Sequence, residues 1–109
     1  MPNTLRDAMT LTAGLGLRYL WFDSLCLVQD DPADFMRGIM NMDLVYEYSY
    51  VSVIAAHGDG AESGLPGVGQ TPRQGRQDTE LLKPGMEIMR VHSLDEHLNK
   101  SVWASRGWT

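Results

Sequence analysis

The sequence has one cysteine, few basic residues and no long apolar run, and each shortage excludes a class of protein. Because Cys26 is the only cysteine, no disulfide can form within the chain, which favours a cytoplasmic location. Nine basic against fourteen acidic residues give a net charge of −5, which opposes a nucleic-acid groove and a polybasic membrane anchor. The longest apolar runs hold about four residues, whereas a membrane-spanning helix needs ~20. A chain of 109 residues forms one domain at most.

Residues 5–15 are predicted to form a helix with one apolar face. Asn3 or Thr4 can cap its start, and Gly16 supplies the left-handed residue at which many helices end. Its apolar stripe recurs at helical spacing and consists of Leu5, Ala8, Met9 and Leu15, with Thr12 between them.

Residues 18–23 and 50–56 are predicted to be strands of one sheet. The first segment is apolar on both faces, with Tyr19 and Trp21 on one side and Leu20 and Phe22 on the other, which is typical of an interior parallel strand. The second segment is rich in β-branched residues.

A helix from Asp31 to Tyr46 is predicted between these strands, with Asp31 as its cap and Pro32 at its first position. Its apolar face, predicted to be buried, holds Phe35, Ile39, Met42 and Tyr46. Strand, helix and strand form a right-handed βαβ unit. The predicted fold class is therefore α/β, a partly parallel sheet with flanking helices in an incomplete flavodoxin-like three-layer arrangement.

The chain divides into three predicted stretches. Residues 1–56 form the helix–strand–helix–strand core, and residues 57–85 form a loop excursion with seven glycines and three prolines. A short helical turn is allowed near residues 61–65. Residues 86–109 begin with a strand over 86–91, and the Ser-Leu-Asp-Glu run from Ser93 has the spacing of a helix start.

Candidate chemistry lies where the two predicted strands end. In a parallel sheet the carboxyl ends of neighbouring strands meet at one edge, where ligands bind. Asp23, Ser24 and Cys26 follow the first strand, and His57 and Asp59 follow the second. If those strands are neighbours, the five side chains face one crevice, and a Cys–His–Asp nucleophilic set is one use of it.

Each of these residues also has a structural interpretation. Asp23 can accept backbone N–H groups of the next turn, with support from Ser24, and Gln29 can bind loop backbone. Cys26 stands between two leucines, as a small buried hydrophobic residue does, and His57 beside Gly58 suits a solvated turn.

Metal and phosphate sites are not indicated. One cysteine and three dispersed histidines lack the spacing of zinc ligands. The glycines at 58, 60, 64, 67 and 69 suggest a phosphate-binding loop, but no Gly-Lys-Ser/Thr run ends the series. The residues alone thus predict an α/β domain without an assigned reaction.

A longer motif carries a family resemblance. Residues 19–29 read Tyr-Leu-Trp-Phe-Asp-Ser-Leu-Cys-Leu-Val-Gln, and the last of them, Gln29, forms a Gln-Asp pair with Asp30. An Arg-Asp-Ala helix precedes this run, and the chain closes on Arg-Gly-Trp-Thr. This order resembles the fungal heterokaryon incompatibility (HET) domain over most of the chain, more weakly over residues 66–100. The motif positions are Arg6, Asp7, Tyr19, Trp21, Asp23, Ser24, Leu25, Cys26, Gln29, Asp30, Arg106, Gly107 and Trp108.

The resemblance also implies segments that this chain lacks. The family usually begins with a strand that carries a Ser-Tyr-x-Trp-Gly motif, and it continues beyond Arg-Gly-Trp-Thr into a Gln-Glu pair and a helix. Neither segment occurs in the sequence. We therefore expect a domain that is truncated at both ends.

The family implies a role in non-self recognition and programmed cell death when incompatible fungal cells fuse, through protein partners or self-association. HET domains are also distantly similar to TIR domains of innate immunity, some of which cleave NAD with a glutamate shortly after a tryptophan. Here Trp108 is present without that glutamate, and Glu62 is a poor substitute. We therefore expect a signalling module without NAD cleavage. A TIR-like NAD-cleaving enzyme and a non-functional gene fragment are the alternatives.

Overall fold

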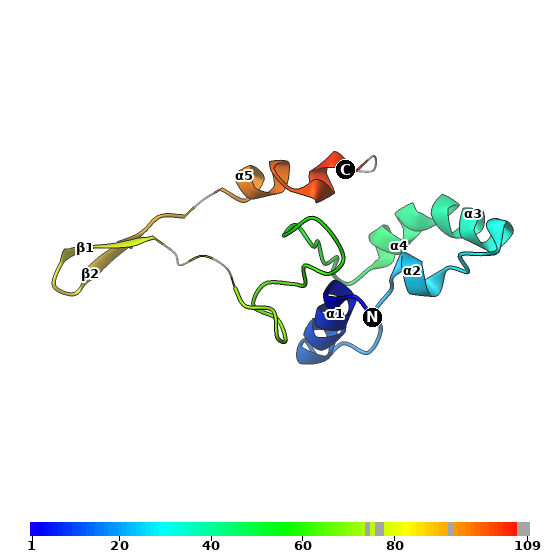
Figure 1. Ribbon diagram of the computed structural model, residues 1–109, viewed down its shortest axis with the longest axis horizontal. Coiled ribbons are helices and arrows are strands. Elements are labelled where there is room, and N and C mark those ends of the chain that lie inside the picture. The colour runs from blue at the N-terminus through cyan, green and yellow to red at the C-terminus, as the bar shows by residue number, and fades with distance from the viewer. Residues whose placement is uncertain (74, 76–77, 92, 107–109) are drawn as a thin grey trace. The chain divides into compact units, whose positions relative to one another are not determined.

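The computed structural model describes residues 1–73, 75, 78–91 and 93–106 (Figure 1). The chain divides into two units, Thr12–Val53 and the combination of Met1–Leu11 with Ile54–Thr109. Among the described residues there are helices and one two-stranded antiparallel sheet, so the secondary structure is mixed α and β.

The first helix, α1 (Asn3–Gly14), confirms the predicted N-terminal helix. It ends as the sequence indicates, because Gly16 has a φ of 73° and two backbone bonds close the last turn. The Gly16 N–H donates to the Ala13 carbonyl and the Leu17 N–H donates to the Thr12 carbonyl, the pattern of a Schellman motif. The predicted apolar stripe is only partly correct, since Ala8 is buried whereas Met9 and Leu15 are exposed.

The predicted helix between the two strand segments is present but is divided into α3 (Pro32–Met40) and α4 (Met42–Tyr48). Its start is confirmed, because the Asp31 carboxylate accepts the N–H groups of Ala33 and Asp34 at 2.9 and 3.2 Å. The break lies at Asn41, whose side chain donates to the Arg37 carbonyl at 2.7 Å and so ends α3. Phe35, Ile39 and Met42 are half-buried, and Tyr46 is exposed.

The predicted parallel sheet is wrong. Residues 18–22 and 50–56 contain no β-ladder, and a short helix, α2 (Asp23–Cys26), begins where the first strand was expected to end. The backbone at Phe22 is extended, with φ −131° and ψ 134°, but extension alone makes no strand. A strand needs hydrogen bonds from a neighbour, and β-branched or aromatic residues only favour such pairing. Tyr19 and Tyr50 are accordingly 89% and 91% exposed.

The sheet that does form is a hairpin of β1 (Thr79–Lys83) and β2 (Met86–Met89). The strand expected over 86–91 is thus confirmed over its first residues, whereas β1 lies inside the predicted loop excursion. Thr79 pairs with Met89 and Glu80 with Ile88 in antiparallel register. Pro84 followed by Gly85, with a φ of 83°, makes the connecting turn.

Two short helices follow the hairpin in the sequence. Helix α5 (Leu94–Asn99) begins as predicted, because the Ser93 hydroxyl accepts the N–H of Asp95 at 3.2 Å. The 3₁₀-helix η1 (Val102–Ser105) comes next, and its start is capped by Ser101. Near residues 61–65, where a helical turn was allowed, the chain forms turns without a helix.

Gly38 allows close packing of Leu27 against α3 in the unit Thr12–Val53. A methyl group placed on Gly38 would lie 2.2 and 2.8 Å from the two Cδ atoms of Leu27 and 3.0 Å from its Cγ. Leu27, which is half-buried, therefore lies directly against the backbone of α3. Gly38 weakens the helix intrinsically, and this contact explains why a glycine is accommodated there.

Replacing Gly38 by alanine should consequently fail to stabilise α3. Helix propensity alone would favour alanine by about 1 kcal/mol, but the half-buried Leu27 side chain must move away from its present contact, which offsets that gain. In a Leu27→Ala background the same change should stabilise the helix, because the clash is gone. Urea unfolding of the four variants measures this coupling, and equal effects in both backgrounds would contradict the contact.

Candidate functional site

The best-buried part of the described chain is a junction between the first turns of α1 and the loop over residues 61–71. We call it the Asp7 junction. Its buried residues are Asp7, Ala8, Gly64 and Leu65. Asp7, only 4% exposed, uses Oδ2 to accept the Leu65 N–H at 2.9 Å and the Thr71 hydroxyl. One carboxylate oxygen of α1 thereby binds the loop at two positions, Leu65 within it and Thr71 at its end.

The start of α1 adds three more bonds to the same loop. The Thr4 N–H donates to the Ala61 carbonyl at 2.9 Å, and the Thr4 hydroxyl accepts the Gly64 N–H at 3.2 Å. The Asn3 side-chain amide donates to the Glu62 carbonyl at 2.9 Å. Asn3 and Thr4 were expected as caps of α1, but both lie inside the helix and bind the loop instead.

Two glycines allow the loop to approach the carboxylate. At Gly64, with a φ of 73°, an added methyl group would lie 2.2 Å from the Thr71 Oγ1 and 2.7 Å from the Asp7 Oδ2. At Gly69, with a φ of 56°, it would lie 2.8 Å from the Asp7 Oδ1. The glycine series that suggested a phosphate-binding loop is therefore used, in part, to enclose a carboxylate of the same chain.

The surroundings of Asp7 favour its ionised form. The Thr71 hydroxyl and then the Leu65 N–H lower the pKa of the Asp7 carboxyl below its usual value, since both donate to the charged form. Burial acts in the opposite direction, and the positive charge of Arg6 adds a smaller lowering effect. Hydrogen bonding outweighs burial, so Asp7 is an anion at neutral pH.

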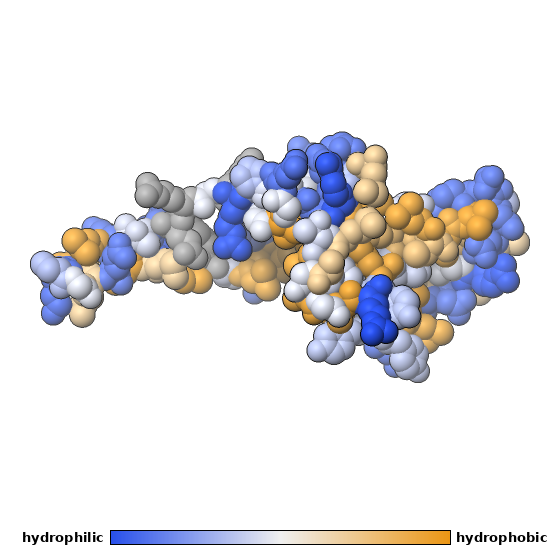
Figure 2. Space-filling model, turned by 90° about the horizontal axis from the view of Figure 1, so that it is seen from below, coloured by the Kyte–Doolittle hydropathy of each residue, from blue (hydrophilic) through white to orange (hydrophobic). Residues whose placement is uncertain are grey.

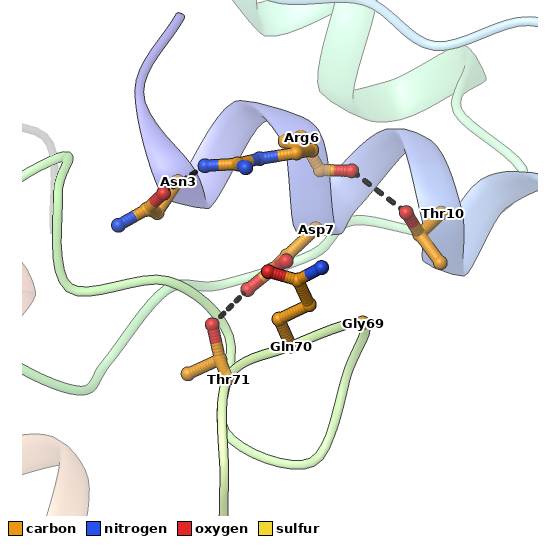
Figure 3. Close-up of a pocket in the computed structure, with 7 residues that line it drawn as sticks. All are labelled: Asn3, Arg6, Asp7, Thr10, Gly69, Gln70 and Thr71. Atoms are coloured by element: carbon orange, nitrogen blue, oxygen red, sulfur yellow. Dashed lines mark hydrogen bonds between the residues drawn. The ribbon is translucent and has the colours of Figure 1, made fainter.

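A cavity of about 370 Å³ opens beside the junction (Figure 3). Helix α1 lines it with Asn3, Arg6, Asp7 and Thr10, and the loop lines it with residues 69–71. Figure 3 shows Arg6 lying along the helix toward Asn3, while Asp7 points from the helix toward Thr71. The lining is polar, with one cation, one anion, amides and hydroxyls, so it suits a small polar ligand.

The predicted residues around Asp23 have local structural roles. The Asp23 carboxylate accepts the Ser24 N–H at 2.6 Å, as its structural interpretation predicted. The Gln29 side chain donates to the Asp23 and Leu27 carbonyls at 3.1 and 3.2 Å, which confirms that it binds loop backbone.

The crevice predicted from Asp23, Cys26 and His57 loses its geometric basis, because the two parallel strands that defined it are absent from the described residues. Cys26 is exposed rather than buried. His57 is exposed in a bend, and the Glu62 side chain is exposed while its carbonyl binds Asn3. Among the described residues, no cluster of three or more metal-ligand side chains occurs.

Sequence reasoning missed the Asp7 junction, although Arg6 and Asp7 were singled out. A signal was available in the spacing, because Thr4, Asp7 and Ala8 share one helical face. A carboxylate on an otherwise uncharged face indicates a buried acceptor. Its partners, Leu65 and Thr71, lie in a loop with no regular pattern and leave no comparable signal.

A model of the heterokaryon incompatibility protein (HET) family matches residues 1–109. The chain belongs to the HET family. No curated protein and no solved structure matches this HET chain significantly. Membership assigns the chain, at family level, to fungal heterokaryon incompatibility proteins.

The HET motif positions are distributed over both units. Arg6 and Asp7 are part of the Asp7 junction, whereas Tyr19, Trp21, Leu25 and Asp30 lie in Thr12–Val53. The Arg106 N–H donates to the Trp103 carbonyl after η1. Gly107 and Trp108 lie outside the described residues. Within the described residues, no helix of this HET protein has the length and apolar character required to cross a bilayer.

Proposed function

We propose that this HET chain is a cytoplasmic interaction module for non-self recognition and cell-death signalling, and that it acts by associating with itself or with another protein domain. The supporting observation is the apolar surface of the unit Thr12–Val53. None of its residues is fully buried. Its large side chains open to solvent are Leu15, Tyr19, Leu25, Val28, Met36, Met40, Leu44, Tyr46, Tyr48, Tyr50, Val51 and Val53.

Such a surface favours association. Contiguous exposed apolar area mostly marks protein–protein contact sites in soluble proteins, and Met and Tyr are enriched at the centres of interfaces. Figure 2 shows apolar residues, in orange, open on the face drawn. On α3 and α4, Met40 is 74% exposed and Tyr48 is 81% exposed, so both are accessible to a partner.

Changing Met40 and Tyr48 together to glutamine should weaken association about tenfold, because exposed apolar anchors contribute a large share of interface energy. Sedimentation of the purified chain over a concentration series measures self-association directly. Expression in a fungal host, scored by growth arrest and cell death, measures signalling. We expect both readouts to fall in the double variant.

The matched control changes Arg37 and Glu47 on the same helices to glutamine, which leaves the net charge and the apolar surface unchanged. Arg37 forms an exposed ion pair with Asp34 at 3.2 Å, a contact of small energetic value. Full self-association and full cell death in the Met40 and Tyr48 variant would refute the proposal. If cell death falls while the chain sediments as a monomer throughout, the partner is another protein domain.

NAD cleavage is the competing activity, and the likeness to TIR domains behind it stays a prediction. Incubation of the purified chain with NAD separates the two functions. Turnover would support the enzyme and contradict our expectation that this chain alone does not cleave NAD.

A further inference from the structure

The two carboxylate oxygens of Asp7 are used differently. Oδ2 accepts the bonds from Leu65 and Thr71, whereas Oδ1 has no hydrogen-bond partner among the described residues. Among the described residues, every completely buried side-chain oxygen or nitrogen has a hydrogen-bond partner. Because Oδ1 has none, it is not completely buried and stays accessible to solvent. Asp7 is 4% exposed and lines the cavity, so this remaining access leads into the cavity. A buried carboxylate therefore offers one free acceptor there.

Arg6 supplies a cation to the lining of the same cavity. The Arg6 guanidinium donates to the Asn3 Oδ1, and the Asn3 amide is itself fixed to the Glu62 carbonyl at 2.9 Å. A guanidinium carries five N–H donors, and the described residues use one side of it, so donors remain for a ligand. Arg6 lines the same cavity as Asp7.

The rim opposite the helix supplies further donors. The side-chain amide of Gln70 has no hydrogen-bond partner among the described residues, and neither do the backbone N–H groups of Gly69 and Gln70. On the helix side, the Thr10 hydroxyl donates to the Arg6 carbonyl at 3.0 Å and keeps its lone pairs as acceptors. Unpaired polar groups thus surround the cavity on both sides.

We propose that this cavity binds a free amino acid as a zwitterion, with its ammonium group on the Asp7 Oδ1 and its carboxylate on Arg6 and Gln70. The negative charge of Asp7 would repel a simple anion, and the positive charge of Arg6 would repel a simple cation. A zwitterion satisfies both through charge-assisted hydrogen bonds, and a guanidinium matches a carboxylate in geometry. The volume of about 370 Å³ suits a small ligand. This ligand site is independent of the proposed association.

L-serine, N-acetyl-L-serine and L-serinamide test the proposal with the full chain. The second compound lacks the ammonium group and the third lacks the carboxylate. In an NMR titration we expect L-serine to shift the backbone amide signals of Gly69 and Gln70. We expect both blocked compounds to bind at least about tenfold more weakly, because each loses a charge-assisted hydrogen bond. Equal binding of the three compounds, or no shift with millimolar L-serine, would overturn the proposal.

Arg6→Gln should weaken L-serine binding about tenfold, since the charged donor for the carboxylate is lost. Arg18→Gln is the matched control, because Arg18 is exposed and lies in the other unit. An unchanged Leu65 amide signal verifies that the junction of the Arg6 variant is intact. If that signal moves, Gln70→Ala replaces Arg6→Gln as the test variant, since Gln70 forms no hydrogen bond within the junction among the described residues. If the variant with an intact junction binds L-serine as tightly as the unaltered chain does, the proposed site is refuted.

Discussion

Replacing Gly64 by alanine is expected to open the Asp7 junction. Alanine at a φ of 73° is strained by about 1–2 kcal/mol. The added methyl group would also lie 2.2 Å from the Thr71 Oγ1, and such overpacking costs about 1–3 kcal/mol. We therefore expect the free energy of opening the junction to fall by about 3 kcal/mol, which corresponds to roughly a hundredfold faster hydrogen exchange at the Leu65 amide.

Gly16 provides the control for this change. It has the same φ of 73°, but an added methyl group would meet no atom within 4 Å. Gly16→Ala therefore carries the backbone strain without the clash, and its effect should stay near 1–2 kcal/mol at the end of α1. If both variants lose the same stability, the close approach of Gly64 to Thr71 and Asp7 is not what holds the junction together.

Acidification is expected to open the same junction through Asp7. Because folding lowers the pKa of Asp7 below its usual value near 3.8, the ionised carboxylate contributes stability that is complete above about pH 5. That contribution is lost as the pH falls through 3.8 toward the lower pKa of the folded state, since protonation weakens the bonds from Thr71 and Leu65. Exchange of the Leu65 amide, corrected for its intrinsic pH dependence, measures the opening.

Asp7→Asn should remove this pH dependence and leave a weaker junction at every pH. The asparagine carbonyl still accepts the N–H of Leu65, but a neutral acceptor forms a weaker bond than a charged one. At neutral pH we expect Leu65 exchange to rise by about tenfold in the variant. Asp59→Asn is the control in the same unit, because Asp59 is exposed and outside the junction. A Leu65 pH profile that is identical with and without the Asp7 carboxylate would assign the acid sensitivity to other groups.

Three local signals in the sequence predicted the ends of helices correctly. Asp31 before Pro32, Ser93 before α5 and Gly16 after α1 each act within a few residues, so their partners can be identified in the sequence itself. The family motif was informative for the same reason, since its order over residues 19–29 is visible without a structure. The assignment of the chain to the HET family, which the family model confirms, did not depend on the predicted sheet.

Long-range pairing could not be predicted in this way. Residues 18–22 and 50–56 have the composition of strands, but a strand depends on a neighbour that composition does not identify. The hairpin formed instead at Thr79–Lys83 and Met86–Met89, where a Pro-Gly turn brings adjacent segments together. The Asp7 junction was missed because Leu65 and Thr71 follow Asp7 by 58 and 64 positions.

The long sequence separation between Asp7 and its partners also determines where the chain tolerates insertions. The bonds of the Asp7 junction close a loop of the polypeptide that includes the whole of Thr12–Val53. The entropy lost on closing a flexible loop grows only logarithmically with its length, and doubling the length costs about 0.6 kcal/mol. Insertions within the exposed turns of Thr12–Val53 should therefore leave the junction intact, whereas a single added carbon at Gly64 should not.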